Sequence, residues 1–334
     1  MDKQTNVAII DVWLGPWPIW TQAWLLSCYH NPTINWLVFC EEPPPNAKDY
    51  PNVSFIPISN AEFENRASKI LGFDCKIPRA HKICDYRPLY GLIFEEELKG
   101  FDFWGWGDND IIWGDIRKFI TEERLTKYDI LTGLRCCIAG QFTIIRNTRK
   151  TNFLWQKVPE YKEKLLGSDK SANVCERGIN EVLLPIEKSG DIKVWRRQLQ
   201  TTDIYCEPWD KWALQVEAED PSEDLSYRWS YGPCHWRKGQ LFDTTSGEEF
   251  MFFHFQHWKG AFKTLPPVYC PLDTARIDID TTGIWPVFEK NSIIRQAQTY
   301  LHQSPAFLKN PKLLRERLGL HRGRYRTNKA ASDS

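Results

Sequence analysis

The stretch FDFWGWGDNDIIWGD, residues 101–115, decides how the chain is expected to fold. Trp, Phe and Ile flank an acidic turn on both sides, which predicts a buried strand that enters the turn and a second strand that leaves it. The turn carries Asp108 and Asp110, two carboxylates that can converge on one hard cation such as Mg²⁺ or Mn²⁺. A lone Asp-x-Asp is more often a solvated turn. This one emerges from an apolar frame whose glycines allow a close approach.

The sequence before this stretch alternates between strand and helix patterns. Short apolar runs predict strands at residues 7–12, 35–40 and 52–58, and longer periodic runs predict helices at 20–29 and 61–71. This alternation predicts an α/β fold with a mostly parallel sheet flanked by helices. Such sheets bind ligands at the carboxyl ends of their strands, where Asp11 to Gly15 and the acidic turn both fall.

Four later segments are also predicted, namely helices at 82–98 and 176–184 and strands at 137–146 and 249–258. Pro88 predicts a kink or a break in the first helix because proline lacks an N–H. On the last strand, His254 would share a face with Gln256 and Trp258. A histidine is more often a satisfied core or surface residue, but His254 with Lys259 could complete a metal and diphosphate clamp at the acidic turn.

The composition narrows the class of protein. The 334 residues contain 43 Lys and Arg against 43 Asp and Glu, and this zero net charge argues against a nucleic-acid-binding protein. The 16 Trp mainly predict core packing, although indole faces also suit sugar rings. The ten cysteines are scattered without a CxxC pair, so reduced thiols are expected and no zinc site. The apolar beginning is interrupted by Asp11, Pro16 and Pro18, so we expect neither a leader nor a transmembrane helix, and a cytoplasmic protein.

The chain is expected to comprise one catalytic domain, residues 1–303, and a basic tail, residues 304–334. Lys and Arg far outnumber Asp and Glu in the tail. Such a tail is either flexible or lies close to anionic lipids, which would place the protein at the inner face of the membrane.

Four segments carry a resemblance to known proteins: KICDYRPLYGLIF (82–94), LKGFDFWG (98–105), Asp108-x-Asp110 and GDIRKFI (114–120). This block resembles an uncharacterised family of predicted bacterial glycosyltransferases from surface-polysaccharide clusters. More distantly, Val7 to about Lys259 resembles the GT-A glycosyltransferases of the glycogenin and lipopolysaccharide galactosyltransferase branch. The resemblance implies a GT-A fold and a hexosyltransferase that needs Mn²⁺ or Mg²⁺. Its donor would be a nucleotide-sugar, with a UDP-sugar favoured, and its acceptor a glycan or a lipid-linked glycan in polysaccharide biosynthesis.

The resemblance also implies roles for individual residues. Asp108, Asp110 and His254 would bind the metal, and Glu176 would be the catalytic residue. The residues that would contact the donor are Asp11, Trp13, Gly15, Lys82, Asp85, Asp108, Asn109, Ala139, Gly140 and Lys259. The chain departs from the family's pattern at two positions: Ile138 stands where the family has Asn, and Cys175 where it has the first member of an acidic or Asp-Gln pair.

Two other functions stay open at this point. A metal-dependent phosphoesterase could use Asp108, Asp110, His254 and His257, and the Trp content alone would suit a sugar-binding protein without catalysis. Two-metal hydrolases usually have more His and Asp ligands in short motifs than this chain, which has seven His, so the phosphoesterase ranks below the transferase. The stereochemical course is open as well: an inverting enzyme would use Glu176 as its base, whereas a retaining one would stabilise an oxocarbenium-like state in the same neighbourhood.

Overall fold

A computed structural model describes residues 4–134, 138–167, 169–172, 174–197, 200–202, 233–244, 246–255, 259–263, 265–280 and 283–288 of the chain. Its largest sheet has seven strands: β1 (Val7–Trp13), β2 (Ile34–Cys40), β3 (Val53–Pro57), β4 (Phe103–Gly107), β6 (Ile130–Thr132), β7 (Phe142–Arg146) and β8 (Val194–Arg196). The strand order is β3-β2-β1-β4-β7-β6-β8. β7 runs antiparallel to β4 and β6, and the other pairings in this sheet are parallel. The predicted mostly parallel α/β sheet is therefore confirmed.

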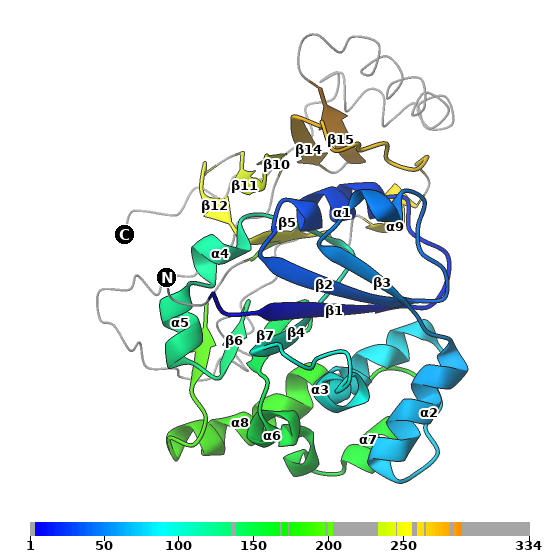
Figure 1. Ribbon diagram of the computed structural model, residues 1–334, viewed down its shortest axis with the longest axis vertical. Coiled ribbons are helices and arrows are strands. Elements are labelled where there is room, and N and C mark those ends of the chain that lie inside the picture. Colours follow the sequence, from blue (N-terminus) through cyan, green and yellow to red (C-terminus); the bar gives the residue numbers. More distant parts are fainter. Residues whose placement is uncertain are drawn as a thin grey trace, which may run out of the picture.

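Helices cover both faces of this sheet (Figure 1). One face packs against α2 (Asn60–Leu71), α3 (Tyr90–Ile93), α6 (Arg149–Asn152), α7 (Tyr161–Leu166), α8 (Ile179–Lys188) and the 3₁₀ helices η2 (Ala80–Leu89) and η3 (Leu154–Lys157). The other face packs against α1 (Thr21–Tyr29), α4 (Ile116–Phe119) and α5 (Glu122–Lys127). A further 3₁₀ helix, η1 (Ala47–Asp49), precedes β3.

The alternation of side chains along β1 explains why both faces are covered. Ala8 and Ile10 are buried in the core on the α2 side, whereas Val7 and Ile9 are buried in the core on the α1 side. Successive side chains of a strand point to opposite faces, so a strand that is apolar throughout needs a packed layer on each side. The continuous apolar runs in the sequence are what this sheet requires.

Two smaller sheets lie beyond the α1 face (Figure 1). The five-stranded antiparallel sheet contains β12 (Glu249–Phe250), β11 (Gln240–Asp243), β10 (Cys234–Arg237), β14 (Arg276–Asp280) and β15 (Gly283–Val287). The three-stranded sheet contains β5 (Ile111–Trp113), β13 (Phe252–His254) and β9 (Gln200–Thr202). In this second sheet, β13 runs antiparallel to β5, and α9 (Lys259–Phe262) follows it along the chain. The strand that leaves the acidic turn is thereby joined to a segment about 140 residues away.

Several predicted elements differ in the structure. The helix expected at 82–98 is the 3₁₀ helix η2 followed by the short α3, since Pro88 lacks an N–H and disfavours helical backbone at Arg87. The strand expected at 249–258 is divided between two sheets, because the Gly114 N–H binds Met251 O and draws the chain from β12 towards β5. Residues 256–258 lie outside the described part of the chain.

Two further predictions hold in part. The strand expected at 137–146 is shorter and begins at Phe142. The helix expected at 176–184 is preceded by a π-helical turn, η4 (Val174–Gly178), and continues as α8. By contrast, the helix predicted at 61–71 matches α2 closely. Ser59 caps α2 by accepting a hydrogen bond from Glu62 N at 3.1 Å, and Gly72 ends it with a φ of 73°.

In the described part of the chain, no helix combines the length and the apolar composition that crossing a lipid bilayer requires.

Gly105 allows β4 to pack closely against β7 because it has no Cβ, and this provides a test of the arrangement. A Cβ at Gly105 would lie 2.2 Å from Thr143 O and 2.6 Å from Ile144 Cγ2, so Gly105→Ala should lower the free energy of unfolding by about 3 kcal/mol. Gly100 has a φ of +87° and nothing within 4 Å of a Cβ, so Gly100→Ala should cost only about 1 kcal/mol of backbone strain. Urea denaturation measures both. Equal losses would show that β4 and β7 are not packed this closely.

Candidate metal and donor site

The acidic turn is held between β4 and β5 by backbone hydrogen bonds on both sides. Asp108 follows β4, and its N–H donates to Gln141 O at 3.1 Å. Asp110 precedes β5, and its carbonyl accepts from Phe255 N at 3.2 Å. The β5–β13 register pairs Ile111 with His254, so it brings the His254 ring beside the Asp110 carboxylate. The turn thus lies at the carboxyl end of β4, next to β1, where the strand order reverses direction.

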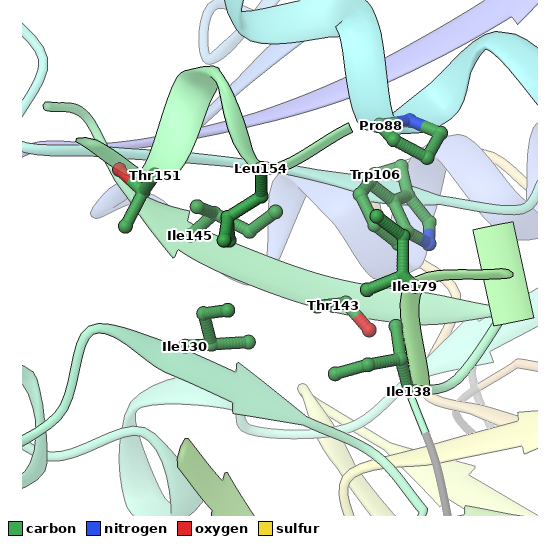
Figure 2. Close-up of a pocket in the computed structure, with 9 residues that line it drawn as sticks. All are labelled: Pro88, Trp106, Ile130, Ile138, Thr143, Ile145, Thr151, Leu154 and Ile179. Atoms are coloured by element: carbon green, nitrogen blue, oxygen red, sulfur yellow. The ribbon is translucent and has the colours of Figure 1, made fainter. Parts of the chain in front are cut away.

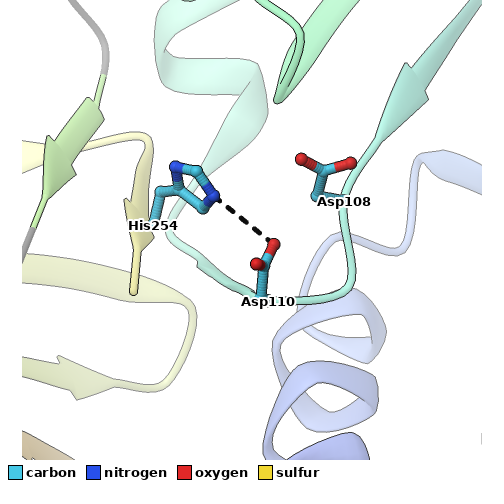
Figure 3. A group of neighbouring side chains, drawn as sticks. All are labelled: Asp108, Asp110 and His254. Carbon is cyan, nitrogen blue, oxygen red and sulfur yellow. Dashed lines mark ion pairs between the residues drawn. The ribbon is translucent and has the colours of Figure 1, made fainter. Parts of the chain in front are cut away.

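Asp108, Asp110 and His254 form one cluster of ligand atoms (Figure 3). One side-chain ligand atom from each of the three residues lies within 4.8 Å of the other two. The His254 Nε2 atom is 3.4 Å from Asp110 Oδ1, and the His254 and Asp110 side chains are 5% and 9% exposed. Two carboxylates and one imidazole are oxygen and nitrogen donors that suit Mn²⁺ or Mg²⁺, with the imidazole favouring Mn²⁺. The donor set therefore fits the divalent cation that the sequence predicts.

The two carboxylates of the turn differ in their electrostatics. Burial raises the pKa of Asp110, but His254 and Lys259 outweigh burial and hold this pKa far below its ordinary value. Burial also raises the pKa of Asp108, and there Arg87 only partly offsets burial, so the pKa stays above its ordinary value. For His254, burial lowers the pKa, but the charge and hydrogen bond of Asp110 raise it overall. Without a cation, Asp110 is therefore an ionised carboxylate that favours a protonated His254.

Lys259 is the second cation on Asp110. It stands at the first position of α9, and its Nζ is 2.6 Å from Asp110 Oδ2. Burial lowers the pKa of Lys259, but the charge and hydrogen bond of Asp110 raise it overall. Its side chain is 38% exposed, so the ammonium lies at the rim of the cluster, where an incoming anion can reach it.

Arg87 completes the site, and its role was missed in the sequence. Its guanidinium donates to Asp108 Oδ1 and to the carbonyl oxygen of Gly140. Asp85, two residues earlier on η2, pairs instead with Lys82, whose Nζ is 3.1 Å from its carboxylate. The available signal was the position of Arg87 inside the specific 82–120 block, only a few residues from two predicted donor contacts.

Glu176 reaches the same place from the π-helical turn η4. Its Oε1 accepts a hydrogen bond from Gly140 N at 3.0 Å. A Cβ at Gly140 would lie 2.5 Å from that oxygen, so a larger residue there would displace the Glu176 carboxylate. Burial is the main cause of the raised pKa of Glu176, and the charge of Asp108 adds to it. π-Helical turns recur at functional sites. The structure thus brings Glu176 and Gly140 together beside the Arg87–Asp108 pair.

Ala139 and Ile138 are part of the supporting layer. Ala139 is fully buried, its N–H donates to Thr132 Oγ1 at 2.7 Å, and its carbonyl accepts from Trp106 Nε1 at 3.1 Å. Ile138, which stands where the resembled family has Asn, donates its N–H to the Asn180 side chain at 3.1 Å. A donor contact by Ala139 stays a prediction.

Asp11, on β1, is the most unusual carboxylate of the site. Burial, Asp108 and Asp110 raise its pKa from 3.8 to about 7, against a smaller lowering effect of Arg87 and Asn109. Among the described residues, neither Asp11 Oδ2 nor Asn109 Nδ2 has a hydrogen-bond partner of normal geometry, although both atoms are buried. Buried polar atoms normally have partners. Asn109 lowers the pKa of Asp11 by hydrogen bonding, so the two side chains lie together beside the end of β1, where a ligand would compete for both groups.

The loop after β1 carries the other predicted donor contacts. The Trp13 indole N–H donates to Pro16 O at 3.1 Å, and its ring stacks on Trp17 with centroids 6.2 Å apart. Gly15 has a φ of +134° and nothing within 4 Å of a Cβ position, so the loop is open at this point. The structure thus places Trp13 and Gly15 on the same edge of the sheet as Asp11.

Lys82 and Asp85 lie behind the site. Both side chains are fully buried and bind protein atoms: Lys82 Nζ binds Asp85 and two carbonyl oxygens, and Asp85 accepts three further hydrogen bonds. Their predicted contact with a donor stays a prediction. In this structure their polar atoms are already satisfied by the protein.

The cavity in Figure 2 is distinct from the cluster of Figure 3 and is lined by seven hydrophobic residues and two threonines: Pro88, Trp106, Ile130, Ile138, Thr143, Ile145, Thr151, Leu154 and Ile179. Its volume is about 10 Å³, close to the smallest that holds a single water molecule. It is too small for a sugar or a nucleotide.

Some predicted features fall outside the described residues. They are His257, the neighbours Gln256 and Trp258, the cysteines Cys136, Cys137 and Cys206, and the basic tail 304–334. Among the described cysteines, Cys28, Cys40, Cys75, Cys84, Cys175 and Cys270 are free thiols, as expected.

Comparison with known proteins adds a family and a set of distant structures. The model of a family of unknown function (DUF6625) matches residues 9–271. A search of curated proteins found no match. Among solved structures, the galactosyltransferase LgtC in complex with donor and acceptor sugar analogs is 10% identical, with a TM-score of 0.40 over 75% of this chain and 86% of that chain.

Two further solved structures are similar at the same level. Glycosyltransferase GlyE of Streptococcus pneumoniae TIGR4 is 11% identical, with a TM-score of 0.34 over 59% of this chain and 46% of that chain. Mouse xyloside xylosyltransferase 1 is 8% identical, with a TM-score of 0.40 over 76% of this chain and 98% of that chain. Similarities at these TM-scores do not decide a function, which has to be inferred from the site itself.

The raised pKa of Asp11 predicts how the stability of the metal-free protein depends on pH. Between pH 4 and 7, the unfolded carboxyl has lost its proton while the folded one still holds it, so stability falls as the pH rises. This component has a slope of at most about 1.4 kcal/mol per pH unit. Asp11→Asn should remove it, which urea denaturation in the presence of a chelator at a series of pH values can measure. The exposed Asp74→Asn is the control and should keep the wild-type slope. An unchanged slope in Asp11→Asn would contradict the assignment.

Proposed function

Because the chain belongs to this family of unknown function, the family name supplies no activity, and we propose one from the site: a metal-dependent glycosyltransferase with a GT-A-like fold. It would transfer a hexose from a nucleoside-diphosphate sugar, with a UDP-sugar favoured, to a glycan or lipid-linked acceptor in polysaccharide biosynthesis. The cofactor would be Mn²⁺ or Mg²⁺. The observation that carries the proposal is the cluster of Asp108, Asp110 and His254 with Lys259 at its rim.

The charges of this cluster suit a diphosphate. A divalent cation bound by Asp108, Asp110 and His254 would supply positive charge to the diphosphate oxygens. Lys259 adds an ammonium that is bound to Asp110 and is exposed on one side. When the bond between the sugar and the diphosphate breaks, negative charge grows on the leaving group. Groups that are held in place to stabilise such charge usually make the largest contribution to catalysis.

The nucleoside of the donor would lie at the end of β1. Asp11 and Asn109 offer a carboxyl and an amide there whose mutual contact lacks normal hydrogen-bond geometry, and Trp13 offers an aromatic face beside the open Gly15. A base edge or a ribose hydroxyl pair presents the matching donors and acceptors, and an indole face suits a flat ring. Asp11 is also close enough to the cluster to interact with its charges, since Asp108 and Asp110 both raise the pKa of Asp11. Base and diphosphate would therefore bind to neighbouring strands.

Glu176 is the proposed catalytic residue. The acceptor hydroxyl oxygen would form a bond to the anomeric carbon while the bond from that carbon to the diphosphate breaks. In an inverting reaction, the Glu176 carboxylate would take the hydroxyl proton, and its raised pKa makes it a better base than an exposed glutamate. In a retaining reaction, its charge would stabilise the oxocarbenium-like state. Its Oε1 is already directed by Gly140 N, so the side chain is held in place.

The proposal extends to the setting of the reaction. We expect a cytoplasmic enzyme without a nucleic-acid partner, whose basic segment 304–334 holds it near a membrane that carries the acceptor. The residues 1–303 would then supply the whole catalytic domain.

Replacing Asp110 tests the metal and the donor together. Asp110→Asn should weaken Mn²⁺ binding by about 100-fold and abolish the Mn²⁺-dependent binding of UDP, because it removes the ionised carboxylate of the cluster. Calorimetry measures both affinities. The exposed Asp74→Asn should bind like the wild type. Unchanged affinities in Asp110→Asn would refute the metal assignment. Release of phosphate from simple esters by the wild type would favour the phosphoesterase, and nucleotide binding without turnover of any donor would favour a sugar-binding protein.

Glu176→Gln separates catalysis from binding. The amide oxygen of Gln can still accept from Gly140 N, so we expect the affinities for Mn²⁺ and UDP to stay within about threefold of the wild type. The kcat of donor hydrolysis, screened over nucleotide-sugars, should fall by about 100-fold or more. A variant that keeps the wild-type kcat would remove Glu176 from the reaction.

A further inference from the structure

The buried pair Lys82–Asp85 joins two helix ends that are separated in the sequence. Lys82 Nζ lies 3.1 Å from Asp85 Oδ2 and 3.2 Å from each of two carbonyl oxygens, those of Lys164 and Lys170. Each of the three donors of the ammonium therefore has an acceptor. Lys164 belongs to the last turn of α7, where carbonyls lack partners inside the helix and a cation is favoured.

Asp85 binds N–H groups near the start of the next helix, whereas Lys82 binds carbonyl oxygens. Its carboxylate accepts from Ser171 Oγ at 2.8 Å, Ala172 N at 2.8 Å and Val174 N at 3.1 Å. Val174 begins the π-helical turn η4, which continues into α8, and N–H groups at such a start lack partners inside the helix. The pair thus places a cation on one carbonyl in the last turn of α7 and on the carbonyl of Lys170, and an anion on N–H groups at and just before the start of η4. It fixes the connection between the two.

The pair and its partners are close in the chain to two residues of the site. Arg87 follows Asp85 by two residues on η2 and binds Asp108 and Gly140 O. Glu176 follows Val174 by two residues on η4 and binds Gly140 N. Arg87 and Glu176 therefore approach Gly140 from two elements that Lys82 and Asp85 join. Lys82 and Asp85 are themselves 1% and 0% exposed, and their polar atoms bind protein atoms.

We propose that Lys82 and Asp85 are positioning residues: the buried pair sets the distance between η2 and η4, so that Arg87 meets the carbonyl oxygen of Gly140 and Glu176 meets its N–H. The direct donor contact that the sequence resemblance implied for them stays a separate prediction. The part of the proposal that concerns catalysis rests on the proposed transferase function, whereas the part that concerns the position of η4 does not. A buried ion pair adds little net stability, because both charges lose their water. Its contribution here is to fix the position of η4 relative to η2.

The decisive comparison is between single and double replacements. Lys82→Met leaves the Asp85 charge buried without its cation, so stability should fall. The double variant Lys82→Met/Asp85→Leu removes both charges and should recover much of the lost stability, because apolar residues fill the site without a desolvation penalty. It cannot restore the hydrogen bonds to residues 164–174. We therefore expect the kcat of donor hydrolysis to stay about tenfold or more below the wild type in both variants.

The chain offers a matched control. Arg146 and Asp129 form a 3.0 Å ion pair, Arg146 also donates to three carbonyls, and Asp129 accepts from Lys193 N, but neither residue contacts the site. Arg146→Met should lower stability and leave kcat at the wild-type value. If kcat recovers together with stability in the Lys82→Met/Asp85→Leu variant, the pair is only structural and the proposal is wrong.

Amide hydrogen exchange tests the positioning without any activity. In Lys82→Met and in the double variant, exchange should rise in residues 174–188, with β1–β3 unchanged, while Mn²⁺ affinity stays within about threefold of the wild type because the ligand strands are not held by the pair. Unchanged exchange at 174–188 would overturn the proposal. If the wild type hydrolyses no nucleotide-sugar, the transferase function fails, but the exchange result still decides whether the pair positions η4.

Discussion

The candidate site depends on the antiparallel pairing of β5 with β13. β5 leaves the acidic turn, and three paired residues join it to a segment that is about 140 positions later in the chain. Without this pairing, Asp108 and Asp110 would form an acidic turn at the edge of a parallel sheet, with no imidazole and no lysine nearby. The pairing brings in His254 directly and leads the chain to Lys259 at the start of α9. The hydrogen bond from Gly114 N to Met251 O at 2.7 Å fixes the end of the β5–β13 pairing that is farther from the acidic turn. The geometry of the cluster is therefore set by backbone contacts.

The second constraint on the site is its charge. In the described part of the chain, Asp11, Asp108, Asp110 and Glu176 gather near Arg87, His254 and Lys259. The burial of these groups makes each unpaired charge costly, so the cations are distributed over the carboxylates. Asp110 receives two of them and stays ionised, whereas Asp11 receives none directly and its pKa rises to about 7. Different neighbours thus give four similar carboxyl groups different chemistry.

Much of this arrangement could be predicted from the sequence because it rests on local patterns. Apolar runs predicted β1 and β2, and the frame around residues 108–110 predicted the acidic turn. The cluster of Asp108, Asp110 and His254 was also predicted, from ligand types and from a resemblance. Arg87 could not be found in this way, because its position depends on the 3₁₀ helix that replaces the expected helix 82–98. A 3₁₀ helix turns its residues differently from an α-helix, so the direction of the Arg87 side chain does not follow from a period of 3.6.

The contacts of Lys82 and Asp85 could not be predicted from the sequence for a related reason. Their partners are mainly carbonyl and N–H groups of residues 164–174, and backbone groups have no signature in a sequence. The division of the expected strand 249–258 between two sheets was not predictable either, since it follows from a backbone hydrogen bond between Gly114 and Met251. The chemistry of the side chains could therefore be predicted from the sequence, whereas contacts with backbone groups could be identified only in the structure.

The ion pairs on the acidic turn have a consequence for how ligands would bind. Lys259 and His254 now neutralise Asp110, and a divalent cation that binds this carboxylate competes with both. The Lys259 ammonium would then lose its contact with Asp110 and could face an incoming diphosphate. Metal and diphosphate would therefore each increase the affinity for the other, by the same factor, as thermodynamic linkage requires. The protein would bind either ligand weakly alone and both tightly together.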